Sequence, residues 1–130
     1  MEQKELVEAC WRDRQLLKDG KNIELINSII AQIDRGELRV ASPQESGEWV
    51  VNEWVKKAVI LYFPIRQMKV EEIGIFEYHD KMQLKTGYES LGVRVVPPAV
   101  ARYGAYLSKG VILMPSYVNI GAYVGENTMV

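Results

Sequence analysis

The chain has 130 residues, of which 48% are apolar and 25% charged, a composition typical of a folded globular protein. Its formal net charge of −1 gives no strong electric field, so we expect neither a nucleic-acid partner nor a membrane partner. The lone cysteine, Cys10, excludes an internal disulfide and a cysteine zinc cluster and fits a reducing compartment. Residues 1–5 are too charged for a signal peptide, and the apolar run 58–63 is too short to span a bilayer. We therefore expect a cytoplasmic protein.

Three helices are predicted in the first half of the chain. The first covers about residues 2–18, and Gly20 is predicted to stop it. The second begins with Asn22 as its cap and carries one apolar stripe, formed by Ile26, Ile29, Ile30 and Ile33. The third begins after Asn52 and is closed by Pro64. Its wide apolar face predicts that it is the most buried of the three. These stripes favour a small helical core over a partner-binding groove.

A short β-hairpin is predicted between the second and third helices, with strands at 38–41 and 48–51 around a turn-rich segment. On the third helix, Lys56 and Lys57 lie opposite the apolar face. We expect them to be solvated, and contact with an anionic substrate is the less favoured interpretation. From residue 65 to residue 85 the signals are mixed, and alternation at 81–85 suggests one strand.

Residues 100–130 carry a repeat with a period of six. Large apolar side chains recur at every sixth position, and a small residue follows each of the first five after four places. The apolar positions are Val100, Tyr106, Ile112, Val118, Val124 and Val130, and the small ones are Gly104, Gly110, Ser116, Ala122 and Thr128. Neither a helix of period 3.6 nor a strand of period 2 produces this pattern. It predicts a parallel β-helix with three flat sides, the apolar residues stacked inside and the small ones at the corners. A meander of antiparallel strands leaves the small residues unexplained.

The whole sequence therefore predicts an α+β protein with two parts. Residues 1–91 form a helical N-terminal domain with a short hairpin, and residues 92–130 form the first coils of a left-handed parallel β-helix. The pair Pro97-Pro98 predicts an extended lead-in to the coils. Five hexads make fewer than two coils, whereas a solenoid generally needs about three repeats and a cap. We expect the chain to be the N-terminal portion of a longer polypeptide; the alternative is a non-catalytic module for trimerisation or partner docking.

Several segments go beyond the bare repeat and resemble one enzyme family. They are Trp54–Val59, Asp80–Lys85, Val93–Arg102 and Met114–Val124. These segments resemble the 2,3,4,5-tetrahydropyridine-2,6-dicarboxylate N-succinyltransferases of bacterial diaminopimelate and lysine biosynthesis. The resemblance implies transfer of a succinyl group from the co-substrate succinyl-CoA to the amino group of the ring-opened dicarboxylate, 2-amino-6-oxopimelate. It also implies sites between the subunits of a homotrimer, with no bound cofactor.

The resemblance also assigns candidate site residues. Arg94 matches the family's substrate-binding arginine, and Arg102 is a second, less favoured candidate. A guanidinium suits this substrate because its planar fork can hold a carboxylate through two charge-assisted hydrogen bonds. The alternative for Arg94 is a salt bridge within its own subunit.

No catalytic residue and no metal ligand is expected within these 130 residues. The family's catalytic aspartate and its coenzyme A site lie in later coils, so the cofactor-binding residues stay unassigned. His79 is the single histidine, and a surface or capping role is favoured over a catalytic base. One imidazole per subunit also argues against the zinc site of a hexapeptide carbonic anhydrase, which needs three.

Overall fold

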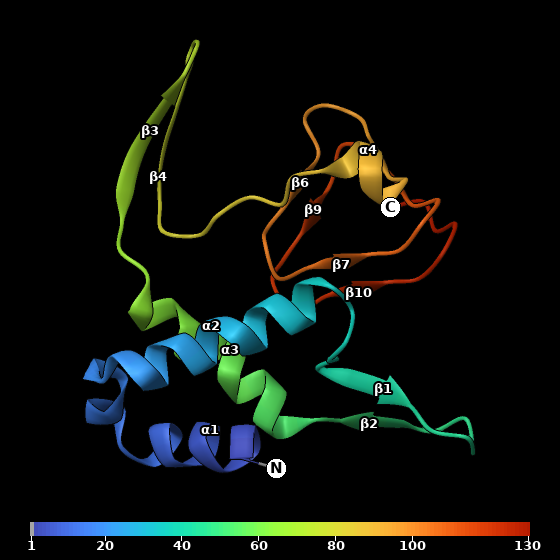
Figure 1. The fold of residues 1–130 in the computed structure, drawn as a ribbon. Coiled ribbons are helices and arrows are strands. Elements are labelled where there is room, and N and C mark those ends of the chain that lie inside the picture. The colour runs from blue at the N-terminus through green and yellow to red at the C-terminus, as the bar shows by residue number, and fades with distance from the viewer. Residues whose placement is uncertain (1) are drawn as a thin grey trace.

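The computed structural model describes residues 2–130, and it shows helices near the N-terminus, two hairpins and a C-terminal coil (Figure 1). The helices are α1 (Glu2–Arg12), α2 (Gly20–Asp34), α3 (Glu53–Ile65) and the short α4 (Tyr88–Leu91), with one 3₁₀ helix, η1 (Arg14–Lys18). The predicted α+β class and the helical character of the N-terminal part are confirmed.

The boundaries of the first two helices differ from the prediction because two aspartates act as caps. Asp13 caps η1 through its carboxylate, so the predicted helix at 2–18 is divided in two. Asp19 caps α2 in the same way. Gly20 is therefore the first residue of α2 and not a stop, and the prediction that Asn22 caps this helix is wrong. The side-chain amide of Asn22 instead donates to the carbonyl of Leu16 at 2.8 Å.

The helices pack around one hydrophobic core, to which α2 contributes the predicted stripe of four isoleucines. The other buried members are Val7, Cys10, Val55, Ala58, Leu61, Tyr62, Met82 and Ile120. Ile120 belongs to the C-terminal coil, so the coil closes one side of this core. The helix α3 buries four of its 13 residues and α2 four of its 15, so α3 buries the largest fraction of the three long helices, as predicted. Pro64 lies inside α3, which ends one residue later.

The predicted hairpin is present, with its first strand shifted toward the C-terminus. The strands β1 (Ala41–Pro43) and β2 (Trp49–Val51) pair antiparallel, with Ser42 opposite Val50. Asn52 occupies the position before α3, as predicted, but its side chain does not cap the helix. Its amide donates to the carbonyl of Arg39 at 2.8 Å and to the hydroxyl of Ser42 at 3.1 Å, which fixes the hairpin to the start of α3.

A second hairpin was not predicted. The strands β3 (Lys69–Ile73) and β4 (Phe76–Asp80) pair antiparallel and project away from the helices (Figure 1). We call residues 69–80 the arm. The predicted strand at 81–85 is wrong, because this segment forms only an isolated bridge between Leu84 and Arg102. Neither face of the arm is buried, so the apolar alternation that reveals a half-buried strand is missing there.

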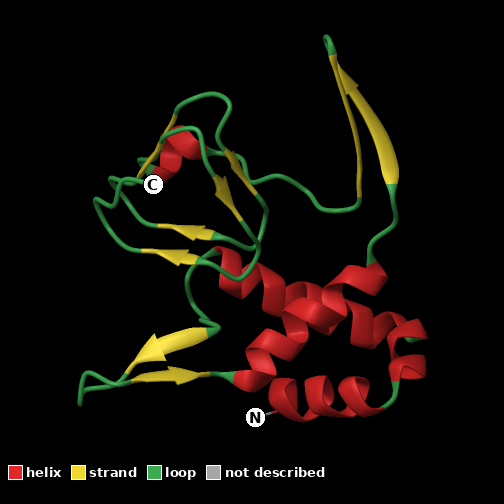
Figure 2. Ribbon diagram, turned by 180° about the vertical axis from the view of Figure 1, so that it is seen from behind, coloured by secondary structure: helices red, strands yellow, loops and turns green. Residues whose placement is uncertain are grey.

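The C-terminal part forms a coil of six two-residue strands (Figure 2). They are β5 (Arg94–Val95), β6 (Val100–Ala101), β7 (Tyr106–Leu107), β8 (Ile112–Leu113), β9 (Tyr117–Val118) and β10 (Tyr123–Val124). Each of the first three pairs in parallel with the strand three places later, 17 or 18 residues further along the chain. The chain therefore returns to the same side after every third strand.

The predicted inward positions are wrong in the first half of the repeat. The residues that fill the coil there are Ala101, Leu107 and Leu113, each at most 1% exposed. The predicted Val100, Tyr106 and Ile112 lie one position earlier and are only partly buried. In the second half the predicted Val118 and Val124 do belong to the inner cluster. The step from Leu113 to Val118 is five residues, so the inward register shifts by one at this corner. In most of these strands both residues are apolar, so the sequence does not show which of the two faces inward.

Two of the small residues predicted at corners of the coil, Gly104 and Gly110, do occupy corners. Gly104 and Gly110 both have positive φ angles, of 97° and 84°, and the next such corner is Gly121 instead of the predicted Ala122. Gly104 also lies in close contact, because a Cβ placed there would come within 2.6 Å of the Ile120 side chain. At this corner both the backbone conformation and the available space require glycine.

Candidate functional site

Arg94 lies on the outer face of the coil. Val95 packs against the buried residues inside the coil, so its neighbour Arg94 points outward, as alternation along a strand requires. Ile112 is paired with Arg94, and Met129 is paired in turn with Ile112. We call these three residues and the adjacent Met114 the Arg94 wall. Met114 and Met129 are 43% and 65% exposed, so the wall presents an arginine on an apolar surface.

The Arg94 guanidinium is available for a ligand. No carboxylate within residues 2–130 lies at ion-pair distance from it. The alternative of a salt bridge within its own subunit is therefore absent from the part of the chain that the structure describes. A guanidinium on an apolar surface can bind a carboxylate through two parallel hydrogen bonds, and the neighbouring methionines would limit competition from water.

Arg102, the second predicted candidate, already has acceptors within the chain. Its Nη2 donates to Oδ2 of Asp80 at 3.0 Å, and its Nη1 donates to Oδ1 of Asn119 at 3.3 Å. The hydroxyl of Tyr117 also donates to this Asn119 oxygen, at 2.9 Å. The backbone N–H of Lys81 and the Arg102 guanidinium hold the pKa of Asp80 below its usual value. The contacts of Arg102 therefore attach the end of the arm to the coil.

The two arginines do not lie on one side of the coil. Arg94 belongs to the pair β5–β8, whereas Arg102 directly follows β6 of the pair β6–β9. The structure therefore offers Arg94 as the free guanidinium and gives Arg102 a role in joining two parts of the chain.

A buried ion pair that the sequence did not reveal forms a second attachment of the coil. Nζ of Lys85 lies 2.8 Å from Oδ1 of Asp34, and the same carboxylate oxygen accepts the backbone N–H of Gly104 at 2.8 Å. The Lys85 side chain is only 4% exposed. Fifty-one positions separate the two partners, so no local pattern could have predicted the pair. Through Gly104 it connects the end of α2 to the corner of the coil between β6 and β7.

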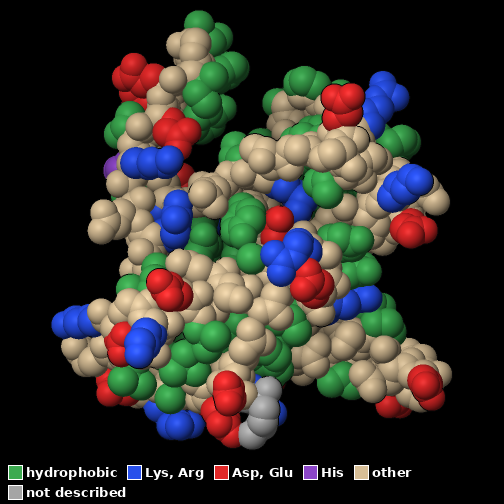
Figure 3. All heavy atoms as spheres, viewed as in Figure 1, with side chains coloured by type: hydrophobic (Ala, Val, Ile, Leu, Met, Phe, Trp, Pro, Cys, Tyr) green, Lys and Arg blue, Asp and Glu red, His purple; other side chains and the backbone are tan. Residues whose placement is uncertain are grey.

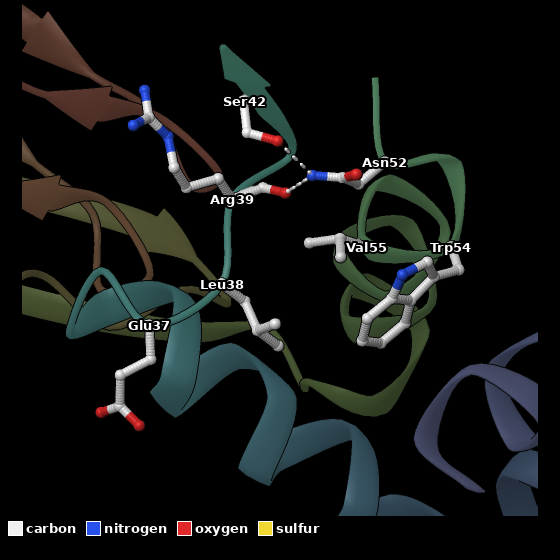
Figure 4. Close-up of a pocket in the computed structure, with 7 residues that line it drawn as sticks. All are labelled: Glu37, Leu38, Arg39, Ser42, Asn52, Trp54 and Val55. Atoms are coloured by element: carbon white, nitrogen blue, oxygen red, sulfur yellow. Dashed lines mark hydrogen bonds between the residues drawn. The ribbon is translucent and has the colours of Figure 1, made fainter. Parts of the chain in front are cut away.

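A cavity of about 300 Å³ lies beside the β1–β2 hairpin (Figure 4). Its lining residues are Glu37, Leu38, Arg39, Ser42, Asn52, Trp54 and Val55. The charged groups there are engaged: Glu37 is hydrogen-bonded to Arg35, which lowers the pKa of the Glu37 carboxyl, and Arg39 stacks on Tyr123. Neither predicted site arginine lines this cavity, so it is not the site that the sequence indicates.

His79 and Cys10, the other residues that could carry chemistry, do not line this cavity. His79 is exposed on the arm. Cys10 is buried in the helical core, where burial and the nearby Asp13 carboxylate raise the pKa of its thiol. Across residues 2–130 the structure brings together no group of three or more side chains that could hold a metal ion. Within the same residues no helix has the length and apolar character needed to cross a membrane.

Comparison with known proteins shows which family the chain resembles. The family model described as the tetrahydrodipicolinate N-succinyltransferase N-terminal domain matches residues 2–65. An Acinetobacter baylyi protein named 2,3,4,5-tetrahydropyridine-2,6-dicarboxylate N-succinyltransferase is 49% identical over 113 residues, which is 82% of this chain and 41% of the relative. The chain matches the N-terminal portion of tetrahydrodipicolinate N-succinyltransferases. Enzymes of the same name from Idiomarina loihiensis and Dechloromonas aromatica are 50% and 42% identical, over 82% and 95% of this chain.

The match to the family model covers only the first of the two parts of the chain. The tetrahydrodipicolinate N-succinyltransferase model covers the helices α1, α2 and α3 and ends before the arm, Arg94 and Arg102. The chain spans 41%, 41% and 48% of the three relatives, which is less than half of their length in each case. The roles of Arg94 and Arg102 in binding a substrate therefore stay predictions.

Proposed function

We propose that the protein is an N-succinyltransferase that transfers the succinyl group of succinyl-CoA to the amino group of ring-opened tetrahydrodipicolinate, in diaminopimelate and lysine biosynthesis. The observation that carries this proposal is the identity of 42–50% to enzymes named for this substrate and reaction, over most of the chain. The free guanidinium of Arg94 supports it, because the substrate is a dicarboxylate.

The proposed reaction depends mainly on holding the substrate amine and the thioester in the correct orientation. The substrate amine attacks the thioester carbonyl, the C–N bond forms, the C–S bond breaks and coenzyme A leaves as its thiol with the proton lost by the amine. Arg94 would hold one substrate carboxylate through two hydrogen bonds and so orient the amine toward the thioester. No residue within this chain is proposed as the proton acceptor, and the coenzyme A contacts are unassigned.

The proposed architecture divides the chain near Leu91. We propose that residues 92–130 begin a left-handed parallel β-helix, which the parallel pairing of every third strand supports. We further propose a homotrimer with sites between subunits, in the cytoplasm, with no nucleic acid or membrane as partner. The exposed apolar residues around Arg94 support a site that a second subunit completes.

The role of Arg94 is tested by steady-state kinetics that follow release of the coenzyme A thiol. In the full-length enzyme, Arg94→Ala should raise KM for the dicarboxylate about 10- to 100-fold and leave KM for succinyl-CoA nearly unchanged, as the loss of a charge-assisted hydrogen bond predicts. Arg94→Lys should keep the charge but lose the fork, with an intermediate effect. Lys56→Ala, which removes an exposed cation from α3, is the matched control. An unchanged KM for the dicarboxylate in Arg94→Ala would remove Arg94 from the site.

The activity itself is tested by comparing two lengths of the protein. We expect no thiol release from the 130 residues alone and clear, dicarboxylate-dependent release from a protein of the relatives' length, because the relatives extend beyond the matched region. Turnover by the 130 residues would show that the later coils are dispensable. Thiol release by neither protein would count against the proposed reaction and in favour of the alternative, a non-catalytic module.

A further inference from the structure

Three residues of the Arg94 wall follow one another across the strands of the coil. The backbone N–H of Arg94 donates to the carbonyl of Val111 at 3.0 Å, and that of Val130 donates to the carbonyl of Ile112 at 2.9 Å. These hydrogen bonds fix the register, and paired residues of parallel strands point to the same face. Arg94, Ile112 and Met129 therefore form one row on the outside of the coil, which we call the outer row.

The outer row has one charged end, and the rest of it is apolar. Neighbouring strands lie about 4.8 Å apart, so the backbone positions of Arg94 and Met129 are about 10 Å apart. An extended chain advances about 3.6 Å over three bonds, so the carbon chain of a substrate such as 2-amino-6-oxopimelate is about 7 Å long. A hydrogen bond to the guanidinium adds about 3 Å. A substrate that starts at Arg94 and runs along the outer row therefore reaches Met129.

The charge on the outer row sets it apart from the arm, which is another exposed apolar surface of the chain. Figure 3 shows hydrophobic side chains gathered on the outer half of the arm. The strands of the arm carry four acidic side chains, and their single lysine, Lys69, is already paired with Glu71. The arm therefore has no free cation for a carboxylate, whereas the outer row combines a free guanidinium with an apolar surface.

We propose that Ile112 and Met129 determine substrate specificity by contacting the methylene groups of the substrate while Arg94 holds one of its carboxylates. This inference deepens the proposed function and rests on it, because it takes the substrate to be a dicarboxylate. Arg94 then selects for the carboxylate, and the apolar part of the outer row selects for the length of the chain. The flexible thioether of Met129 can follow the shape of that chain.

The test is the binding of straight-chain dicarboxylates of increasing length to the full-length enzyme, measured by isothermal titration calorimetry. For the parent enzyme, the affinity should rise about fourfold with each added methylene until the chain reaches the length of the substrate. Arg94→Lys should weaken the binding of every dicarboxylate by about the same factor and keep this dependence on length. That variant loses the planar fork of the guanidinium but leaves the apolar residues of the outer row in place.

Met129→Ser should change the dependence on length itself. We expect about tenfold weaker binding of the longest dicarboxylates and unchanged binding of the shortest, because only the longest chains reach Met129. Met129→Leu keeps an apolar side chain of similar size and should bind like the parent. The matched control is Met68→Ser, because Met68 is also a well-exposed methionine, 48% exposed, but lies between α3 and β3. This control should also bind like the parent.

Three results would overturn the proposal. They are a parent affinity that does not depend on chain length, an unchanged length dependence in Met129→Ser, and an equal loss of length dependence in Met68→Ser. Failure of the proposed reaction looks different. Length-dependent binding without release of the coenzyme A thiol would reject succinyl transfer and keep the role of the outer row. Thiol release together with an unchanged length dependence in Met129→Ser would keep the reaction and reject that role.

Discussion

Two ion pairs that differ in burial lie where the coil meets the rest of the chain. In the Lys85–Asp34 pair the side chains are 4% and 20% exposed, and the lysine also donates to the backbone carbonyl of Asp34. In the Arg102–Asp80 pair they are 18% and 44% exposed. The Lys85 side chain is almost completely shielded from solvent, whereas water reaches the Asp80 carboxylate directly.

This difference determines what each attachment contributes. When one partner of a buried pair is removed, the other charge stays without a partner in a poorly solvated place, which costs several kcal/mol. When one partner of an exposed pair is removed, water replaces it, and the measured effect is about 1 kcal/mol or less. We therefore expect the α2 attachment to hold the coil in place and the arm attachment mainly to orient the arm.

The largest effect is expected for Lys85→Met. This change keeps most of the side-chain volume but removes the ammonium from Asp34, so we expect a loss of about 3 kcal/mol in the free energy of unfolding. Urea denaturation at pH 7 measures it. Lys69→Met, which breaks an exposed pair with Glu71 on the arm, is the matched control and should change stability by less than about 0.5 kcal/mol. Equal losses in the two variants would contradict the comparison.

The next effect concerns the corner that donates to Asp34. Gly104 has a φ of 97°, and an added Cβ would lie 2.6 Å from the Ile120 side chain and 3.3 Å from that of Ile30. We expect Gly104→Ala to destabilise the protein by about 2–4 kcal/mol, from backbone strain and overpacking together. The control is Gly47→Ala. Gly47 also has a positive φ, of 88°, but open space around it, so this variant should lose only about 1 kcal/mol of stability, from backbone strain alone. Similar losses in both variants would show that packing at Gly104 is unimportant.

The sequence predicted those elements whose burial follows a period. The isoleucine stripe of α2 and the repeat of six in the coil were both visible, because one face of each element is buried in a regular way. The inward register was not, since Tyr106 and Leu107 are both large and apolar and either could have faced inward. The arm was missed because it buries no face at all.

The candidate site could be predicted only in part, for a similar reason. Arg94 stands in a local segment that resembles a known family, so it could be named from the sequence, and the structure places it on the outside of the coil. The ion pair between Arg102 and Asp80 could not be predicted, because the two residues are 22 positions apart and only the fold brings them together. Local patterns reveal which residues are exposed or buried, whereas long-range pairing requires the structure.

The exposed attachment should depend on pH in a defined direction. The pKa of Asp80 is lowered in the folded protein, so its carboxylate stabilises the fold at neutral pH, and this contribution declines as the pH falls from about 4 through the lowered folded value. Asp80→Asn should therefore be less stable than the parent by at most about 1 kcal/mol at pH 7, since the group is well exposed. The difference should shrink as the pH approaches 3. Urea titrations at both pH values measure it, and a difference that does not change with pH would count against the role of the Asp80 charge.

The smallest effect is expected where the β1–β2 hairpin meets the coil, because there an arginine stacks on a ring without a counter-charge. The Arg39 guanidinium lies 3.6 Å from the centre of the Tyr123 ring, and Tyr123 packs in turn on Tyr106. Arg39→Lys should cost about 0.5 kcal/mol, because lysine keeps the charge but not the flat stacking surface. A double-mutant cycle with Tyr123→Leu isolates this contact from the hydrogen bond that Arg39 donates to Ala41. A coupling energy of zero would show that the stacking does not hold the hairpin, and a value above about 2 kcal/mol would place this contact with the buried attachment instead of the exposed one.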